Sequence, residues 1–275
     1  LSAIPGLVLK WLFKKPLFLT IREGDPSLIS QNFFMRFIVR NSDYLISNTN
    51  EYFKHMKICK VANNKFIKIR NGVDPIFEKI DKFALREKSN ISKDNVVIIM
   101  AAYLIPRKNP ELLLEAFIIL ENKYPHLLLY FAGEGPLFER LKDKVNSKNL
   151  DDKVKFLGNL NHVNLNKWLN ASDIFCLPTN SDGIANSVVE AMQCSLPIVT
   201  TNVGGFPEII DNGLSGILIE PNNLQSLCLS LEKLIGNSKS RIEMGKQAKN
   251  QLTRKGINWE INARLHFTAY QKVFN

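Results

Sequence analysis

A regular alternation of short apolar runs with helical patterns, beginning near residue 95, restricts the fold of this chain more than any other feature. The runs are rich in β-branched residues, and the segments between them repeat apolar residues at helical spacing. Such alternation is typical of βαβ units, which build a parallel sheet covered by helices. We expect strands at Val96–Ala101, Leu127–Ala132, Val154–Leu157, Ile174–Leu177, Pro197–Thr200 and Gly216–Ile219. These strands predict one doubly wound domain.

The first 75 residues show the same alternation. Because a βα unit takes about 30 residues, only half of a doubly wound domain fits there. The strands expected in this part are Leu17–Ile21, Tyr44–Ser47 and Lys65–Ile69. The helices expected in the two parts are Leu28–Val39, Asn50–Ile58, Pro110–Asn122, Pro136–Ser147 and Asn186–Gln193.

The predicted fold class is therefore α/β, with one partial and one complete Rossmann-like domain. Residues 1–75 form the partial N-terminal domain, and residues 95–255 form the complete C-terminal domain. Residues 76–94 are rich in charge and lack a strand pattern, so we expect a linker there. Residues 256–275 have the pattern of an amphipathic helix, which we expect to return to the N-terminal domain.

The charge of the chain indicates an anionic partner. It contains 36 Lys and Arg against 26 Asp and Glu, a net charge of +10, which fits nucleic acid, an anionic membrane surface or a phosphorylated small molecule. Nucleic acid is disfavoured, because the positive residues are dispersed and form no stripe interleaved with aromatic residues. The segment Lys10–Lys15 fits either peripheral contact with an anionic membrane or an ordinary helix. The apolar segments around it are too short to span a bilayer.

The cysteines and histidines predict no metal site. Cys59, Cys176, Cys194 and Cys228 are far apart and form no C-x-x-C pair, which also argues against a disulfide framework. The histidines are equally scattered. The pair Asp151-Asp152 precedes an expected strand, so we interpret it as part of a turn. Free cysteines favour a reducing, cytosolic setting.

The turns that follow the strands form the candidate site, because ligands of doubly wound sheets bind at the carboxyl ends of the strands. One such turn places Arg107 and Lys108 before Asn109, an expected N-cap, and Pro110. Cations beside the positive end of a helix fit best with a bound anion such as phosphate. Solvated surface cations are the alternative for this turn taken alone.

Three further turns lie at the same predicted edge. Gly133 and Gly135 flank Glu134 after one strand, and Gly204-Gly205 follow another. Glycines allow close approach of a ligand, but they also serve any tight turn. Between these turns, a loop with Asp182 leads into an apolar helix that carries Glu190. A carboxylate on such a helix needs a partner, so we expect the two acids to face one cleft.

Six motifs follow one another along the chain, namely Asn71-Gly72-Val73-Asp74, Pro106 with Lys108, Gly133-Glu134-Gly135-Pro136-Leu137, Phe156-Leu157-Gly158, Asp182 with Glu190-Ala191-Met192, and Gly204-Gly205-Phe206-Pro207-Glu208. In order and spacing they resemble retaining glycosyltransferases of family 4. The resemblance covers nearly all of residues 65–275 and continues more weakly through residues 1–64. It implies the GT-B fold, in which two Rossmann-like domains face each other, and an N-terminal domain that is truncated here.

The resemblance also implies roles for individual residues. Lys108 matches the lysine that grips the donor diphosphate, Glu190 the carboxylate that bonds the ribose hydroxyls, and Asp182 the acid that contacts the transferred sugar. These three are the expected catalytic residues. The implied donor-binding set is Tyr103, Arg107, Lys108, Gly135, Leu160, Gly183, Ile184, Asn186, Ser187, Val188, Glu190, Gly204 and Gly205.

Three positions depart from the family pattern. Tyr103 stands where the family commonly has an arginine, Asp182 where it usually has a glutamate, and Arg22 where many members have a histidine. A diphosphate cation is therefore absent, and one carboxylate reaches less far. We expect lowered activity or an altered donor.

The activity implied by the resemblance is transfer of a sugar, with retention of configuration, from a nucleotide-sugar to a hydroxyl of a sugar or glycolipid acceptor. This fits cell-surface polysaccharide or glycolipid synthesis in the cytoplasm, at the inner face of the membrane, without a metal or other cofactor. One alternative is a non-catalytic nucleotide-sugar-binding subunit, with a partner chain that supplies the missing N-terminal strands. A nucleotide-sugar epimerase is the less favoured alternative, because it lacks the motif that ends at Glu190.

Overall fold

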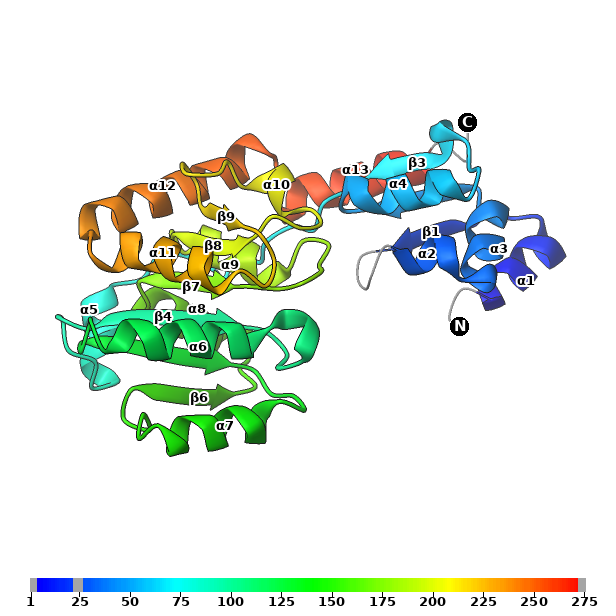
Figure 1. Cartoon of the computed structure of the whole chain (residues 1–275). Helices are drawn as coiled ribbons and strands as arrows, with labels where there is room; N and C mark the ends of the chain where they lie inside the picture. Colours follow the sequence, from blue (N-terminus) through cyan, green and yellow to red (C-terminus); the bar gives the residue numbers. More distant parts are fainter. Residues whose placement is uncertain (1–3, 22–26, 272–275) are drawn as a thin grey trace. The chain divides into compact units, whose positions relative to one another are not determined.

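The chain divides into two compact units (Figure 1). The computed structural model describes residues 4–21 and 27–271. The N-terminal unit comprises Leu1–Gly72, Ser181–Ile184 and Ile257–Asn275, and the C-terminal unit comprises Val73–Asn180 and Ala185–Gly256. Each unit is described below by itself.

The C-terminal unit is built on a six-stranded parallel sheet with the order β6-β5-β4-β7-β8-β9. The first strand in sequence, β4, lies next to β7, so the strand order reverses between these two, as in Rossmann-like folds. Every residue of β4 is buried, which is expected for a central parallel strand with helices on both faces. The strands are β4 (Val96–Ala101), β5 (Leu127–Ala132), β6 (Val154–Gly158), β7 (Ile174–Leu177), β8 (Ile198–Thr201) and β9 (Ile217–Ile219).

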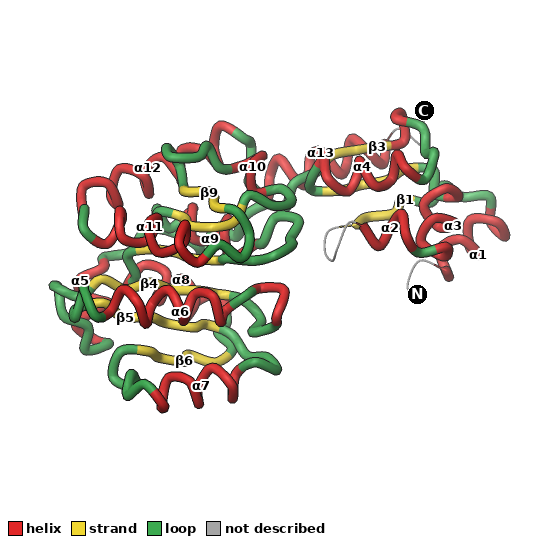
Figure 2. The backbone as a smooth tube through the Cα atoms, in the orientation of Figure 1, coloured by secondary structure: helices red, strands yellow, loops and turns green. Residues whose placement is uncertain are grey.

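Helices cover this sheet, and α6 lies along the strands on the side that faces the viewer in Figure 2. Helix α6 packs against α11, α9 against α12, and α5 against α8. A short 3-10 turn, η2 (Pro106–Lys108), precedes α6. The helices of this unit are α5 (Lys82–Lys88), α6 (Pro110–Glu121), α7 (Phe138–Ser147), α8 (His162–Ala171), α9 (Asn186–Gln193), α10 (Phe206–Ile209), α11 (Leu224–Ile235) and α12 (Ser238–Arg254).

The N-terminal unit holds a three-stranded parallel sheet with the order β1-β2-β3. Ala269 of the last helix packs against Ile46 and Ile69, and Asn262 donates a hydrogen bond to the Arg70 carbonyl at 2.6 Å. The end of the chain thus packs within the same unit as its beginning. The elements are α1 (Ile4–Phe13), β1 (Phe18–Ile21), α2 (Ser27–Gln31), α3 (Phe33–Asn41), β2 (Tyr44–Ser47), α4 (Asn50–Ile58), η1 (Asn63–Lys65), β3 (Phe66–Lys68) and α13 (Trp259–Gln271).

Two local expectations from the sequence are wrong. The helix expected at Leu28–Val39 is two helices, because the Asn32 side chain accepts a hydrogen bond from the Met35 amide at 3.1 Å and starts α3. Asn109 does not cap α6 with its side chain. Its backbone is left-handed, with φ of 54°, and its side-chain amide donates instead to Asn222 at 2.9 Å.

The charged stretch 76–94, where we expected a linker, contains helix α5. The side chain of Arg86 on this helix is buried. None of the helices within residues 4–21 and 27–271 combines the length and the apolar character that crossing a membrane requires.

Candidate active site

A cavity of about 270 Å³ lies beyond the carboxyl ends of β4, β5 and β6. Three of the residues that the sequence assigned to donor binding, Tyr103, Leu160 and Ser187, line this one cavity. They come from the loops after β4 and β6 and from the first turn of α9. The position agrees with the rule that ligands of open parallel sheets bind at this edge. The other residues that line it are Ala101, Ala102, Ala132, Gly133, Glu134, Asn159 and Leu165.

The glycines after β5 allow two loops of this edge to touch through their backbones. A Cβ atom on Gly133 would lie 2.0 Å from the Ala102 carbonyl oxygen, and one on Gly135 would lie 2.5 Å from that of Leu104. Both glycines also have positive φ, 146° and 152°, which side chains disfavour. The Leu104 amide donates to the Glu134 carbonyl at 2.7 Å. These two glycines therefore have a structural role: they allow the two loops that line the cavity to contact each other through their backbones.

The turn that carries Lys108 lies where the strand order reverses. It follows β4, and the Arg107 carbonyl accepts hydrogen bonds from the Asn180 amide at 2.8 Å and from the Thr179 hydroxyl at 2.9 Å. Thr179 and Asn180 follow β7, the neighbour of β4. These hydrogen bonds hold the turn that carries Lys108 at the switch point, the place between β4 and β7 where the strand order reverses. Such sheets bind nucleotides at this position.

Glu190 lies on α9 among buried neighbours, as the sequence predicted. Val188, Val189, Ala191 and Met192 of this helix are all buried. Burial raises the pKa of the Glu190 carboxyl from 4.5 to about 7, while the charge of His162 opposes this rise and that of Asp74 adds to it. The carboxylate is therefore costly to ionise until a partner stabilises its charge.

His162 and Asp74 were not assigned to the site from the sequence. The His162 Nδ1 atom lies 3.3 Å from the Asp74 carboxylate, and His162 begins the helix that follows β6 at the carboxyl edge. The sequence offered two signals for this pair. His162 follows a strand at the carboxyl edge, and Asp74 ends the motif Asn71-Gly72-Val73-Asp74, but the two residues are 88 positions apart. Only folding places the two charges beside Glu190.

The pKa of Glu190 predicts a pH dependence of stability. An unfolded glutamate loses its proton near pH 4.5, whereas the folded chain holds this proton until about pH 7. Stability should therefore fall as the pH rises between these values and stay level above them. The expected fall is on the order of 3–4 kcal/mol, since one pKa unit corresponds to about 1.4 kcal/mol. Urea unfolding of wild type and Glu190→Gln from pH 4 to 8 measures it.

The variant Glu190→Gln should lose this pH dependence, because a glutamine has no proton to release. Glu139→Gln is the matched control, since Glu139 is exposed on α7 and should leave the pH profile unchanged. If Glu190→Gln and wild type show the same slope between pH 4 and 7, folding does not raise the pKa of Glu190.

The remaining residues from the sequence prediction fall into two groups. Asn186, Ser187 and Val188 begin α9 in the C-terminal unit, whereas Asp182, Gly183 and Ile184 belong to the N-terminal unit. Asp182 is buried, and its carboxylate accepts a hydrogen bond from the Gly183 amide at 3.1 Å. The two acids expected to share a cleft are therefore described in different units. Gly204 and Gly205 directly precede α10. Gly135 contacts the backbone of Leu104, as described above.

The model of the family described as glycosyl transferases group 1 matches residues 81–251, which is well over half of the chain. The chain belongs to this family. Two of its relatives are more than 30% identical to it. The UDP-Gal:alpha-D-GlcNAc-diphosphoundecaprenol alpha-1,3-galactosyltransferase of Escherichia coli is 32% identical over 228 residues, which cover 80% of this chain and 55% of the relative. One subunit of the phosphatidylinositol N-acetylglucosaminyltransferase of Homo sapiens is 31% identical over 205 residues, 74% of this chain and 40% of the relative.

A solved structure has the same fold as this chain. Sucrose-phosphate synthase from Thermosynechococcus elongatus matches with a TM-score of 0.88 at 20% identity, covering 99% of this chain and 71% of that one. The likeness confirms the expected α/β fold of GT-B type with two Rossmann-like sheets. The chain spans about half the length of these two curated relatives, 40% of the human protein and 55% of the bacterial enzyme.

Proposed function

We propose that this group 1 glycosyltransferase takes a UDP-sugar as donor and transfers the sugar, with retention of configuration, to an acceptor hydroxyl in cell-surface polysaccharide or glycolipid synthesis. The bacterial relative, by its name, uses UDP-Gal and a diphosphoundecaprenol acceptor. The human relative, by its name, acts on phosphatidylinositol and is one subunit of its enzyme. The first name supports the donor and a lipid-linked acceptor, and the second supports a partner chain.

The observation that carries the proposal is the partly buried carboxyl of Glu190, with its raised pKa, on the helix whose Ser187 lines the cavity at the carboxyl edge. Ribose hydroxyls donate the hydrogen bonds that would stabilise this carboxylate in its charged form. Tyr103 and Leu160 offer an aromatic and an apolar surface for a base in the same cavity. The nucleoside end of a donor therefore has both of the contacts it needs.

In the proposed reaction, negative charge develops on the donor diphosphate as the bond to the sugar breaks. Lys108, at the switch point, and the amides near Gly204 and Gly205 would stabilise that charge in place of a divalent cation. The leaving phosphate would accept the proton of the acceptor hydroxyl on the same face of the sugar. Asp182 would contact the transferred sugar.

We also propose that helix α1 contacts an anionic membrane at its inner face, where a lipid-linked acceptor would lie. Trp11, Leu12 and Phe13 are 59%, 70% and 63% exposed. Lys10, on the same helix, and Lys14 and Lys15, directly after it, line one surface pocket with Trp11. Exposed apolar side chains beside lysines are the combination that binds peripheral proteins to anionic lipids.

A titration of UDP and of uridine tests the proposed function. We expect UDP to bind more tightly than GDP or ADP, and Lys108→Ala to weaken UDP binding about 10- to 100-fold because it removes a charge-assisted contact worth about 1.5–3 kcal/mol. Uridine, which has no phosphate, should bind the variant and the wild type alike. Isothermal titration calorimetry gives each dissociation constant.

Lys148→Ala is the matched control for this titration, because Lys148 is an exposed lysine at the end of α7. It should bind UDP as wild type does. Equal losses of UDP and uridine affinity in Lys108→Ala would show that Lys108 does not contact phosphate. Tighter binding of GDP or ADP than of UDP would overturn the proposed donor.

A further inference from the structure

A second cavity, of about 520 Å³, lies at the opposite edge of the same sheet. Val96, Asp173 and Pro197 line it and mark the amino ends of β4, β7 and β8. It is therefore separate from the candidate active site at the carboxyl ends. Two carboxylates line it, those of Asp94 and Asp173. Against them stand six cationic side chains, those of Lys79, Lys82, Arg86, Lys93, Arg241 and Lys246.

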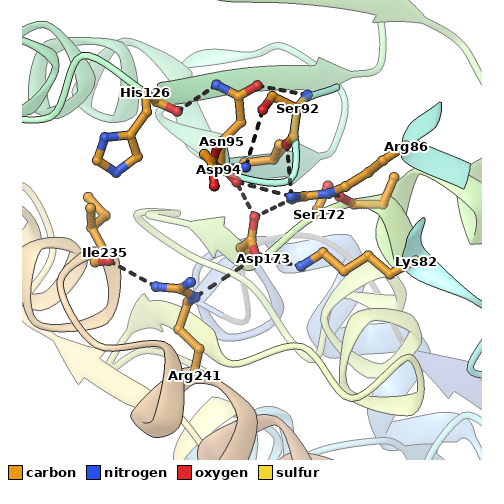
Figure 3. Close-up of polar contacts among 12 residues, drawn as sticks. Lys82, Arg86, Ser92, Asp94, Asn95, His126, Ser172, Asp173, Ile235 and Arg241 are labelled. Atoms are coloured by element: carbon orange, nitrogen blue, oxygen red, sulfur yellow. Dashed lines mark hydrogen bonds and ion pairs between the residues drawn. The ribbon is translucent and has the colours of Figure 1, made fainter. Parts of the chain in front are cut away.

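Asp173 forms ion pairs with three of these six cations. Figure 3 shows Lys82, Arg86 and Arg241 converging on its carboxylate. Lys82 and Arg86 form hydrogen-bonded ion pairs with it, and the Arg241 Nε atom lies 3.9 Å away. The Val97 amide also donates to it at 2.8 Å. One carboxylate thus serves three cations and has no capacity left for the others.

The other three cations have no ion pair within the described part of the chain. Lys93 and Lys246 are exposed at the cavity, and the Lys79 ammonium lies 3.4 Å from the Cys194 carbonyl. Partial removal of this ammonium from water lowers the pKa of Lys79, although Cys194 and Asp173 oppose this effect. Asp94 balances only one of these charges. The cavity therefore keeps a net positive charge, which attracts an anion.

The wall of the cavity is also apolar in part. Phe83 on α5 and Ile242 on α12 are 70% and 60% exposed, and both line it. Its volume falls within the range of about 300–1,000 Å³ that is usual for small-molecule sites. Cations beside exposed apolar side chains fit a ligand that has both an anionic group and an apolar portion.

We propose that this cavity binds a small molecule that carries a phosphate group beside an aromatic or apolar portion. The phosphate lies among Lys79, Lys93 and Lys246, where three ammonium groups have one carboxylate between them. The apolar portion lies against Phe83 and Ile242. This site does not depend on the donor assignment, because no residue of the carboxyl edge takes part in it.

Calorimetric titration with phenyl phosphate and with inorganic phosphate tests the proposal on the whole chain. The reference protein carries Lys108→Ala, so that binding at the carboxyl edge is weakened. We expect Lys79→Gln with Lys246→Gln to raise the dissociation constant of phenyl phosphate at least tenfold relative to this reference. The control variant, Lys88→Gln with Lys239→Gln, also removes two positive charges, but from positions on α5 and α12 that do not line the cavity. It should raise the dissociation constant of phenyl phosphate less than threefold.

Phe83→Ala tests the apolar portion of the site. The reference protein should bind phenyl phosphate more tightly than inorganic phosphate, and Phe83→Ala should remove this preference while leaving the binding of inorganic phosphate unchanged. Thermal unfolding of each variant checks that it is folded, which we expect because Lys79, Lys246 and Phe83 are exposed. Equal effects of the two lysine pairs, or no binding of phenyl phosphate in the millimolar range, would overturn the proposal.

Discussion

Replacing Asp173 with alanine is expected to lower the free energy of unfolding by about 3–5 kcal/mol, the usual cost of breaking a buried ion pair from one side. The guanidinium of Arg86 is the reason, because this residue is only 3% exposed. Its Nε atom donates to the Ala171 carbonyl at 2.9 Å, and its ion pair with Asp173 supplies the compensating charge. Without the carboxylate, a buried cation is left unpaired.

Chemical denaturation of Asp173→Ala and wild type measures this loss. Asp94→Ala is the matched control, since Asp94 lines the same cavity but is exposed, and it should change stability by no more than about 0.5 kcal/mol. Asp173→Asn should lie between the two, because an amide oxygen still accepts a hydrogen bond but has no charge. A loss in Asp173→Ala as small as that in Asp94→Ala would contradict this account of Arg86.

Glu190→Ala is expected to weaken the binding of UDP about 10- to 100-fold, because the hydrogen bonds between a carboxylate and two hydroxyls contribute about 1.5–3 kcal/mol. The effect should be found with uridine as well as with UDP, since the ribose is common to both. In this respect Glu190→Ala differs from Lys108→Ala, whose loss is confined to the diphosphate. The pair of variants thus assigns each side chain to one part of the ligand.

Calorimetry with both ligands on folded Glu190→Ala provides the measurement. Glu139→Ala removes an exposed carboxylate from α7 and should bind both ligands as wild type does. Glu190→Gln should lose less affinity than Glu190→Ala, because its amide oxygen still accepts a hydrogen bond. Unchanged affinity for uridine in Glu190→Ala would rule out the assignment of Glu190 to the ribose.

Much of the fold could be predicted because buried parallel strands leave a clear pattern in the sequence. The structure places each expected strand within one residue at either end, for example β4 at Val96–Ala101 as predicted. Two of the errors fall on asparagines. At Asn32 and Asn109 the side chain makes a specific hydrogen bond that starts or replaces a local structure, and composition alone does not indicate which carbonyl or amide it will find.

A rule of topology predicts where the candidate cavity lies, at the carboxyl ends of the strands. Contacts between distant segments follow from no such rule. The family resemblance assigned Tyr103, Leu160 and Ser187 to donor binding, and all three line one cavity at the strand ends. No such rule joins Arg86 to Asp173, which are 87 residues apart. The charges of residues 76–94 therefore resembled those of a solvated linker, although one of them is buried in an ion pair.

The joined loops at Gly133 and Gly135 have a consequence for protein engineering. Their main-chain contacts with Ala102 and Leu104 hold the rim of the cavity, so substitutions of side chains on that rim should leave its outline in place. A library that varies Tyr103, Leu160 and Leu165, which line the cavity, would therefore sample new nucleotide preferences on an unchanged scaffold. Substitution of either glycine would instead place a Cβ atom against the backbone of the neighbouring loop and disrupt folding.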